Sequence, residues 1–254
     1  MALLRVERVS KRFGGLDALR DVTFSVHERQ IKALIGPNGA GKTTLFNLVS
    51  GAARPSEGHL YLNDVELSGR TPHEICRMGV GRTFQHSLLF DDMSLLENVE
   101  VGRYSRTKAG VLASVLSLPR HRREERATEE AALGALRRVG MDHKADEPAG
   151  NLPMGERHLL EIARALASEP QLLLLDEPAA GLNEEETDRL GDTVRTIRSQ
   201  GVTVLLVEHD MNFVMEISDE VVVLDYGKKI AEGSPLLIQD NEEVIKAYLG
   251  EELE

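Results

Sequence analysis

Short apolar runs alternate with longer polar or amphipathic stretches along most of the chain. The run "QIKALIG" (30–36) predicts a buried strand that ends in a glycine-rich turn, and "KTTLFNLVSG" after it predicts a helix that ends at Gly51. Two further runs, "LLLLD" (172–176) and "VTVLLVE" (202–208), predict buried strands on either side of a polar helix over 183–200. Strands separated by helices predict an α/β fold with a parallel sheet.

The pattern also predicts several local elements. "GHLYLNDVEL" has a central Asn-Asp and predicts a strand followed by a turn. Capping boxes that begin at Thr71 and Ser94 predict two helix starts. Residues 94–168 are almost entirely helical in pattern, and "DYGKK" near 225–229 predicts a hairpin turn before a C-terminal helix. The helical block interrupts the alternation of strands and helices, which indicates an inserted subdomain.

Composition narrows the function. The 254 residues carry 30 Lys and Arg against 42 Asp and Glu, a net charge of −12, which excludes nucleic acid as an expected partner. One cysteine excludes an internal disulfide and is typical of a reducing compartment. The apolar runs are far shorter than the roughly 20 residues of a membrane helix, and "MALLRVERVS" does not resemble a secretory signal. We therefore expect a cytoplasmic protein that another chain would hold at any membrane.

A glycine-rich stretch, "GPNGAGKTT", lies between the first of these strands and its helix and matches the P-loop pattern. Glycines let backbone N–H groups turn toward phosphates, and the helix N-terminus adds a partial positive charge. Lys42 would reach the outer phosphates, and the hydroxyl of Thr43 would hold Mg²⁺. The expected nucleotide-binding residues are Gly36, Pro37, Asn38, Gly39, Ala40, Gly41, Lys42, Thr43 and Thr44.

Two adjacent carboxylates, Asp176 and Glu177, follow the four leucines of the second buried strand. Ligands of α/β sheets bind at the carboxyl ends of the strands. Asp176 would hold Mg²⁺, and Glu177 would orient or deprotonate an attacking water. A GTPase is the rival class, but the chain has no Asn-Lys-x-Asp sequence to read guanine.

Taken together, these motifs resemble those of ABC-transporter ATPase subunits, and the resemblance covers essentially the whole chain. "GPNGAGKTT" is similar to the Walker A motif and "LLLLDEP" to the Walker B motif. The resemblance implies a P-loop NTPase ABC ATPase fold, in which a RecA-like parallel-sheet core carries an N-terminal antiparallel β subdomain and an inserted helical subdomain. It implies a single ABC ATPase domain over 1–254, with the core and β subdomain in 1–85 and 161–254 and the helical subdomain in about 86–160.

The resemblance also implies roles for further residues. Gln85 in "GRTFQ" lies where the family has a glutamine that contacts Mg²⁺ and the transmembrane partner, and His209 matches the switch histidine that contacts the γ-phosphate. Phe13 matches the aromatic residue that stacks on adenine. The catalytic residues are then Glu177, His209, Lys42 and Gln85, and the metal ligands are Thr43, Gln85 and Asp176. The D-loop is Ala180, Gly181, Leu182 and Asn183, the last in place of the usual aspartate.

Within the family, "FGGLDAL", "EIARAL", "DEPAAGLN" and "AYLG" are similar to the ATPase subunit of branched-chain amino acid importers. This resemblance implies ATP and Mg²⁺ as cofactors, transmembrane permease subunits as partners, and a peripheral place on the inner face of the cell membrane. Urea or short amides are possible solutes for relatives of that group. A lipopolysaccharide or lipid exporter ATPase, a soluble ABC protein without transport, and a non-catalytic ATP-binding regulator are the alternatives.

The signature motif departs from the family pattern Leu-Ser-Gly-Gly-Gln, which contacts ATP held by the opposite subunit. Proline lacks both a hydroxyl and an N–H, methionine adds bulk, and glutamate adds negative charge near a phosphate. Losing a hydrogen bond to a charged group costs about 1.5–3 kcal/mol. The branched-chain amino acid importers that the chain resembles pair two different ATPase chains, and mainly for that reason we favour a heterodimer with a second ATPase subunit over a homodimer. The segment is Leu152, Pro153, Met154, Gly155 and Glu156.

Overall fold

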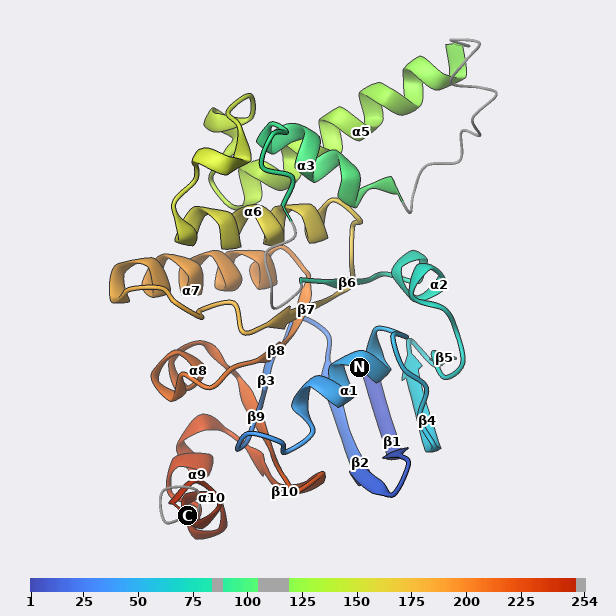
Figure 1. Cartoon of the computed structure of the whole chain (residues 1–254), viewed down its shortest axis with the longest axis vertical. Helices are drawn as coiled ribbons and strands as arrows, with labels where there is room; N and C mark the ends of the chain where they lie inside the picture. Colours follow the sequence, from blue (N-terminus) through green and yellow to red (C-terminus); the bar gives the residue numbers. More distant parts are fainter. Residues whose placement is uncertain (84–88, 105–118, 250–254) are drawn as a thin grey trace.

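The computed structural model describes residues 1–83, 89–104 and 119–249 and contains two β-sheets with helices around them (Figure 1). The strands are β1 (Ala2–Phe13), β2 (Leu16–His27), β3 (Ile31–Ile35), β4 (Glu57–Leu62), β5 (Val65–Glu66), β6 (Val80–Arg82), β7 (Leu172–Asp176), β8 (Thr203–Val207), β9 (Glu220–Asp225) and β10 (Lys228–Gly233). The helices are α1 (Lys42–Val49), α2 (Pro72–Arg77), α3 (Leu95–Gly102), α5 (Pro119–Arg138), α6 (Met154–Leu166), α7 (Glu184–Ser199), α8 (Met211–Ile217), α9 (Pro235–Gln239) and α10 (Glu242–Leu249), with 3₁₀ turns η2 (Asp142–Lys144) and η3 (Ala149–Asn151).

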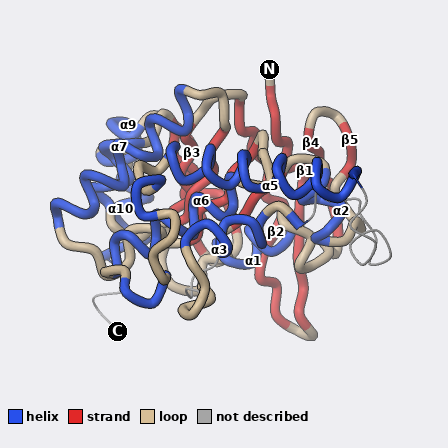
Figure 2. The backbone as a smooth tube through the Cα atoms, turned by 90° about the horizontal axis from the view of Figure 1, so that it is seen from above, coloured by secondary structure: helices blue, strands red, loops and turns tan. Residues whose placement is uncertain are grey.

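The first sheet is antiparallel, with the strand order β2-β1-β4-β5. Its longest hairpin, β1–β2, extends past the helices at one side of the molecule in Figure 2. The predicted Asn-Asp turn joins β4 to β5. Asn63 and Asp64 both have positive φ, 47° and 62°, the backbone of the tight hairpin turn that these residue types favour.

The second sheet has the order β10-β9-β3-β8-β7-β6, in which β9 to β6 are parallel and β10 is antiparallel to β9. Helices cover one face, and α1 together with the first sheet covers the other, which explains the continuous apolar runs. Along β7, Leu173 and Leu175 belong to the core on one face, while Leu172 and Leu174 belong to the core on the other. A strand buried on both faces has apolar residues facing either side, as the four leucines of β7 do.

The helices α3, α5 and α6 pack against one another at the top of Figure 1, and Figure 2 shows them lying across the sheet. The capping boxes at Thr71 and Ser94 are both formed, as predicted. The prediction that residues 94–168 are almost entirely helical was too broad. Within the described part, η2, η3 and non-helical backbone separate α5 from α6, because Gly140 with φ 73° ends one helix and Pro148 precedes η3.

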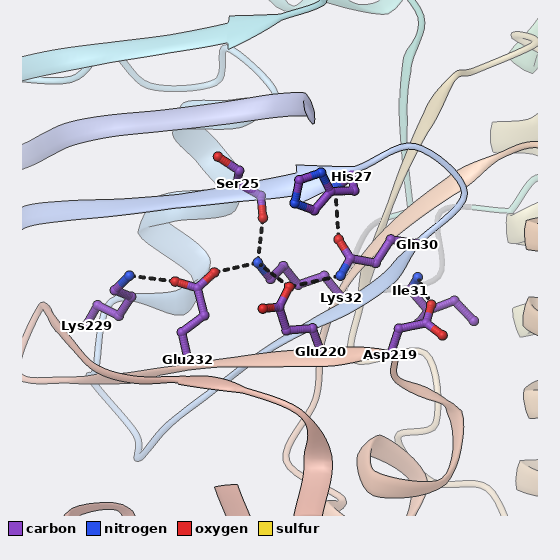
Figure 3. Close-up of polar contacts among 9 residues, drawn as sticks. All are labelled: Ser25, His27, Gln30, Ile31, Lys32, Asp219, Glu220, Lys229 and Glu232. Atoms are coloured by element: carbon purple, nitrogen blue, oxygen red, sulfur yellow. Dashed lines mark hydrogen bonds and ion pairs between the residues drawn. The ribbon is translucent and has the colours of Figure 1, made fainter. Parts of the chain in front are cut away.

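A buried lysine joins the two sheets (Figure 3). Lys32 of β3 is 1% exposed, and its Nζ donates to the backbone oxygen of Ser25 on β2 at 2.5 Å. The same Nζ lies 2.6 Å from Oε1 of Glu232 on β10 and 3.0 Å from Oε2 of Glu220 on β9. The ammonium therefore has three oxygen partners from three strands, which is what a charge buried this deeply requires.

Candidate nucleotide-binding and hydrolysis site

The P-loop connects β3 to α1 as the sequence predicts. Gly36 has φ 145°, and a Cβ there would lie 2.0 Å from the backbone oxygen of Leu224. Gly41 has φ 104°, and a Cβ would lie 2.7 Å from the backbone oxygen of Ala18. Only glycine fits both positions, so the loop packs against its neighbours through bare backbone. The loop leads into the N-terminus of α1, whose partial positive charge favours an anion.

The P-loop forms one wall of a cleft of about 510 Å³, a size typical of small-molecule sites. Lys42 lies over the loop, with Nζ 2.5 Å from the backbone oxygen of Gly36 and 2.9 Å from that of Pro37. The cleft brings together Phe13, most of the P-loop and Glu177, which the sequence separates widely. Its lining residues are Phe13, Leu16, Asp17, Ala18, Arg20, Asn38, Gly39, Ala40, Gly41, Lys42, Thr43, Thr44, Glu177 and Tyr226.

The two carboxylates lie at the end of β7, where the sequence places them. Asp176 is buried, and its Oδ2 accepts a hydrogen bond from Nη2 of Arg82 at 2.9 Å. Nη1 of Arg82 donates to Oδ1 of Asn47 and to Oγ of Ser50, each at 2.8 Å. Arg82 therefore fixes the aspartate against α1. Sequence reasoning missed this contact, although "GRTFQ" contains the arginine.

The end of β8 lies beside the end of β7. The backbone N–H of Glu177 donates to the oxygen of Val207 at 2.9 Å. His209 follows two residues later with an exposed side chain, and its Nδ1 lies 3.8 Å from Oε2 of Glu208. Glu177, which is proposed to orient water, and His209, which is proposed to contact the γ-phosphate, therefore both follow the carboxyl ends of neighbouring strands.

Glu208 was not identified from the sequence and is fully buried at this edge. Its Oε1 accepts from the backbone N–H of Ala179 at 2.7 Å. Its Oε2 accepts from the N–H groups of His209 at 3.0 Å and Asp210 at 3.4 Å. Burial raises the pKa of this carboxyl, and the three backbone donors oppose that shift only in part. One carboxylate therefore ties the turn after Glu177 to the loop that carries His209.

Gln85 lies outside the described residues. Nearby, Thr83 is described and buried, and its Oγ1 accepts from the backbone N–H of Asp176 at 3.3 Å. In the described ranges, no group of three or more His, Cys, Asp or Glu side chains is arranged to hold a metal ion by itself.

The signature segment begins α6 with Pro153 as the N-cap residue and no side-chain cap. Met154 is exposed. The expected negative charge of Glu156 is paired, because its two carboxylate oxygens lie 2.8 and 2.7 Å from Nζ of Lys144 in η2. This ion pair reduces the repulsion of phosphate that the sequence alone predicts.

One contact joins the signature helix to the turn after β7, and a capping box at the end of the D-loop begins α7. Nδ1 of His158 on α6 lies 2.6 Å from the backbone oxygen of Pro178 and donates to it. Asn183 caps α7, accepting at Oδ1 from the N–H of Glu186 at 3.0 Å while Glu186 Oε2 accepts from the N–H of Asn183 at 3.1 Å. Asparagine therefore serves as the N-cap in place of aspartate. The remaining D-loop residues form the short turn before it.

Comparison with known proteins agrees with this geometry. A family model described as "ABC transporter" matches residues 19–180, and one described as "Branched-chain amino acid ATP-binding cassette transporter" matches 228–254. The high-affinity branched-chain amino acid transport ATP-binding protein BraF of Pseudomonas aeruginosa is 46% identical over 98% of both chains. LivG of Escherichia coli (strain K12), which has the same description, is 43% identical over 98% of both chains.

Solved structures confirm the predicted fold class. A nucleotide-free ATP-binding cassette from an ABC transporter has a TM-score of 0.86 and 31% identity, covering 98% of this chain and 99% of that one. The ADP conformation of an ATP-binding cassette of an ABC transporter has a TM-score of 0.86 and 30% identity with the same coverage. In the part of the chain that the structure describes, no helix is long and apolar enough to cross a membrane.

The fold and the P-loop site together define an ATP-binding cassette of the P-loop NTPase class. The chain belongs to the ABC transporter family of ATP-binding proteins. It is therefore an ATPase whose hydrolysis of ATP powers transport. The branched-chain amino acid transport proteins BraF and LivG match it over 98% of both chains.

Proposed function

We propose that this chain is the ATP-hydrolysing subunit of an importer of branched-chain amino acids. The observation that carries the proposal is the cleft in which the P-loop, Phe13 and Glu177 line one cavity. The amino acid specificity rests on relatives at 46% and 43% identity that are described as branched-chain amino acid transport proteins. The partners are transmembrane permease subunits, and the chain acts on the inner face of the membrane that they span.

Each residue of the site has a distinct task in this proposal. The amides of the P-loop and Nζ of Lys42 bind the phosphates, and the ring of Phe13 supports the adenine. Thr43, Asp176 and Gln85 hold Mg²⁺, which offsets phosphate charge when bound. Glu177 orients the attacking water and accepts its proton, because it follows the buried Asp176 at the mouth of the cleft.

His209 contacts the γ-phosphate and senses its release. Its backbone N–H and the turn after Glu177 share the buried carboxylate of Glu208. A shift of the histidine loop is therefore transmitted to the D-loop turn. ATP binding favours the closed pair and hydrolysis releases it, and this change of population drives the permease.

The pair is asymmetric in this proposal. The residues expected to bind and cleave this chain's own ATP have the side chains that the reaction requires. Its signature segment, in contrast, has no capping side chain at Pro153 and an exposed Met154. The Lys144–Glu156 ion pair limits repulsion but restores no hydroxyl donor. A second ATPase subunit with an intact signature therefore closes this chain's site, and this chain's weaker signature closes the partner's site.

Replacement of the proposed base tests hydrolysis. Glu177→Gln should bind ATP with little change and lose about 100-fold or more of ATP turnover, because general base catalysis contributes at least that factor. Glu28→Gln is the matched control, since Glu28 is exposed in the β2–β3 turn outside the cleft. Turnover by the assembled complex that is unchanged in Glu177→Gln would exclude Glu177 from the reaction.

Uptake of radiolabelled leucine tests the solute. Cells that lack this chain should regain leucine, isoleucine and valine uptake with the wild-type gene and should not regain it with Glu177→Gln. If ATPase activity is restored but none of the three amino acids is taken up, the chain is still an ATPase, and the proposed solute class is wrong.

A further inference from the structure

The turn between β9 and β10 packs directly against the nucleotide site. The backbone oxygen of Gly227 accepts from the N–H of Arg20 at 2.7 Å, and the N–H of Gly227 donates to the oxygen of Ala40 in the P-loop at 3.1 Å. A Cβ on Gly227 would lie 2.7 Å from the oxygen of Ala18. The residue just before it, Tyr226, is therefore held at a fixed place relative to the P-loop.

Tyr226 combines two unfavourable features at that place. Its side chain is 81% exposed, although it is large and mostly apolar. Its backbone has φ 40°, in the left-handed region that strains a bulky side chain and favours glycine or asparagine. Strain of this kind concentrates at ligand-binding positions. Tyr226 lines the same cleft as the P-loop. The exposed ring and the left-handed backbone therefore occur where a ligand would contact the side chain.

The same part of the cleft gathers two other exposed apolar side chains. Phe13 is 52% exposed and Leu16 is 67% exposed, and their backbones face each other across the β1–β2 hairpin. Nζ of Lys11 lies 4.8 Å from the centre of the Phe13 ring, a cation–π contact that occupies one face of the ring. Only one face of the Phe13 ring is therefore open to a base. The opposite face of a base stacked there would remain open to a second residue.

We propose that Tyr226 is a second base-contacting residue, which with Phe13 encloses the adenine of the bound nucleotide. This inference rests on the proposed ATP site and extends it to the β9–β10 turn. The turn carries the aromatic ring, while the hydrogen bonds of Gly227 to Arg20 and Ala40 fix its position. Adenine would exchange the solvent around the tyrosine ring for aromatic contact, which offsets the strained backbone.

The test separates base contact from phosphate contact. Dissociation constants of ATP and of inorganic tripolyphosphate, which has no base, are measured on the full chain for wild type, Tyr226→Asn and Tyr226→Phe. Tyr226→Asn should raise the ATP dissociation constant about 5- to 20-fold, a loss within the range of one base–aromatic contact. Its tripolyphosphate constant should stay unchanged, and Tyr226→Phe should bind ATP like wild type.

Asparagine tolerates the left-handed backbone, so Tyr226→Asn should unfold at the same or a higher temperature than wild type. Leu236→Asn, at a residue 76% exposed on α9 and outside the cleft, is the matched control and should leave both constants unchanged. Wild-type affinity for ATP in Tyr226→Asn, or an equal loss of ATP and tripolyphosphate, would overturn the inference. Failure of wild type itself to bind ATP would instead contradict the proposed function.

Discussion

Glu208 is a carboxylate with no exposed surface that three backbone N–H groups hold between two catalytic loops. No single stretch of sequence predicts this arrangement, because the donor at Ala179 lies on another strand's loop. The motif residues themselves were predictable, since the P-loop and the Asp176–Glu177 pair are contiguous and follow apolar strands. Arg82 and Lys144 were missed for the same reason as Glu208, because their partners are distant in the chain.

Glu208→Gln should therefore lower kcat for ATP hydrolysis by about 10-fold while KM changes little. Displacing the two loops slows the hydrolysis step more than it weakens the binding of ATP. The amide retains one acceptor and turns an NH₂ group toward backbone donors. Steady-state kinetics of the assembled complex over a range of ATP concentrations measure both constants. Glu185→Gln, exposed in the first turn of α7, is the control. An unchanged kcat would show that Glu208 has only a packing role.

The raised pKa of Glu208 also predicts the direction in which the free energy of unfolding changes with pH. The folded state binds its proton more tightly than the unfolded state, whose value is near 4.5. Wild type should therefore lose stability relative to Glu208→Gln as the pH rises from 4.5 through the raised pKa. Urea unfolding of both proteins over pH 4 to 8 measures the difference. A constant difference across that range would contradict the raised pKa.

At the scale of elements, caps and strands were predicted more accurately than connections. Thr71 and Ser94 form their boxes because the interacting residues are three apart and the information is local. The segment between α5 and α6 was predicted wrongly as helix, because its 3₁₀ turns follow from contacts with α3 and α6 and not from periodicity. The boundaries proposed for the helical subdomain, about 86–160, stay a prediction.

The buried Lys32 makes the junction of β2, β3, β9 and β10 sensitive to pH. Burial would raise the pKa of Glu232, but hydrogen bonds from Lys229 and Lys32 and their positive charges lower it overall, below 4.5. The resulting stability is complete above 4.5 and is lost as the pH falls through the lowered pKa. Glu232→Gln should destabilise the chain by about 1–3 kcal/mol at pH 7.

Urea unfolding of Glu232→Gln and wild type from pH 7 to pH 3 checks this expectation. The two free energies of unfolding should converge toward the acid end. Glu57→Gln, whose carboxylate pairs with the exposed Arg12 at 2.9 Å, is the control and should change stability by less than about 1 kcal/mol. A Glu232→Gln deficit that persists unchanged at pH 3 would reject the ionic role.

At the scale of the whole molecule, the α/β class followed from the alternation of strands and helices, but the strand order did not. The order β10-β9-β3-β8-β7-β6 places β3, an early strand, in the centre of later ones. Only the resemblance to the ABC family implied this architecture, because pairing between distant strands leaves no periodic signal. That central position is what brings the P-loop beside the ends of β7 and β8.

The whole-molecule proposal is that this chain hydrolyses its own ATP only when another subunit supplies an intact signature. The most direct measurement is the mass of Glu177→Gln in solution by light scattering, with and without ATP. The account predicts that the variant binds ATP and remains a single chain of 28.0 kDa. An ATP-dependent doubling of that mass would contradict it, because the segment from Leu152 to Glu156 would then close a site on a second copy of the chain.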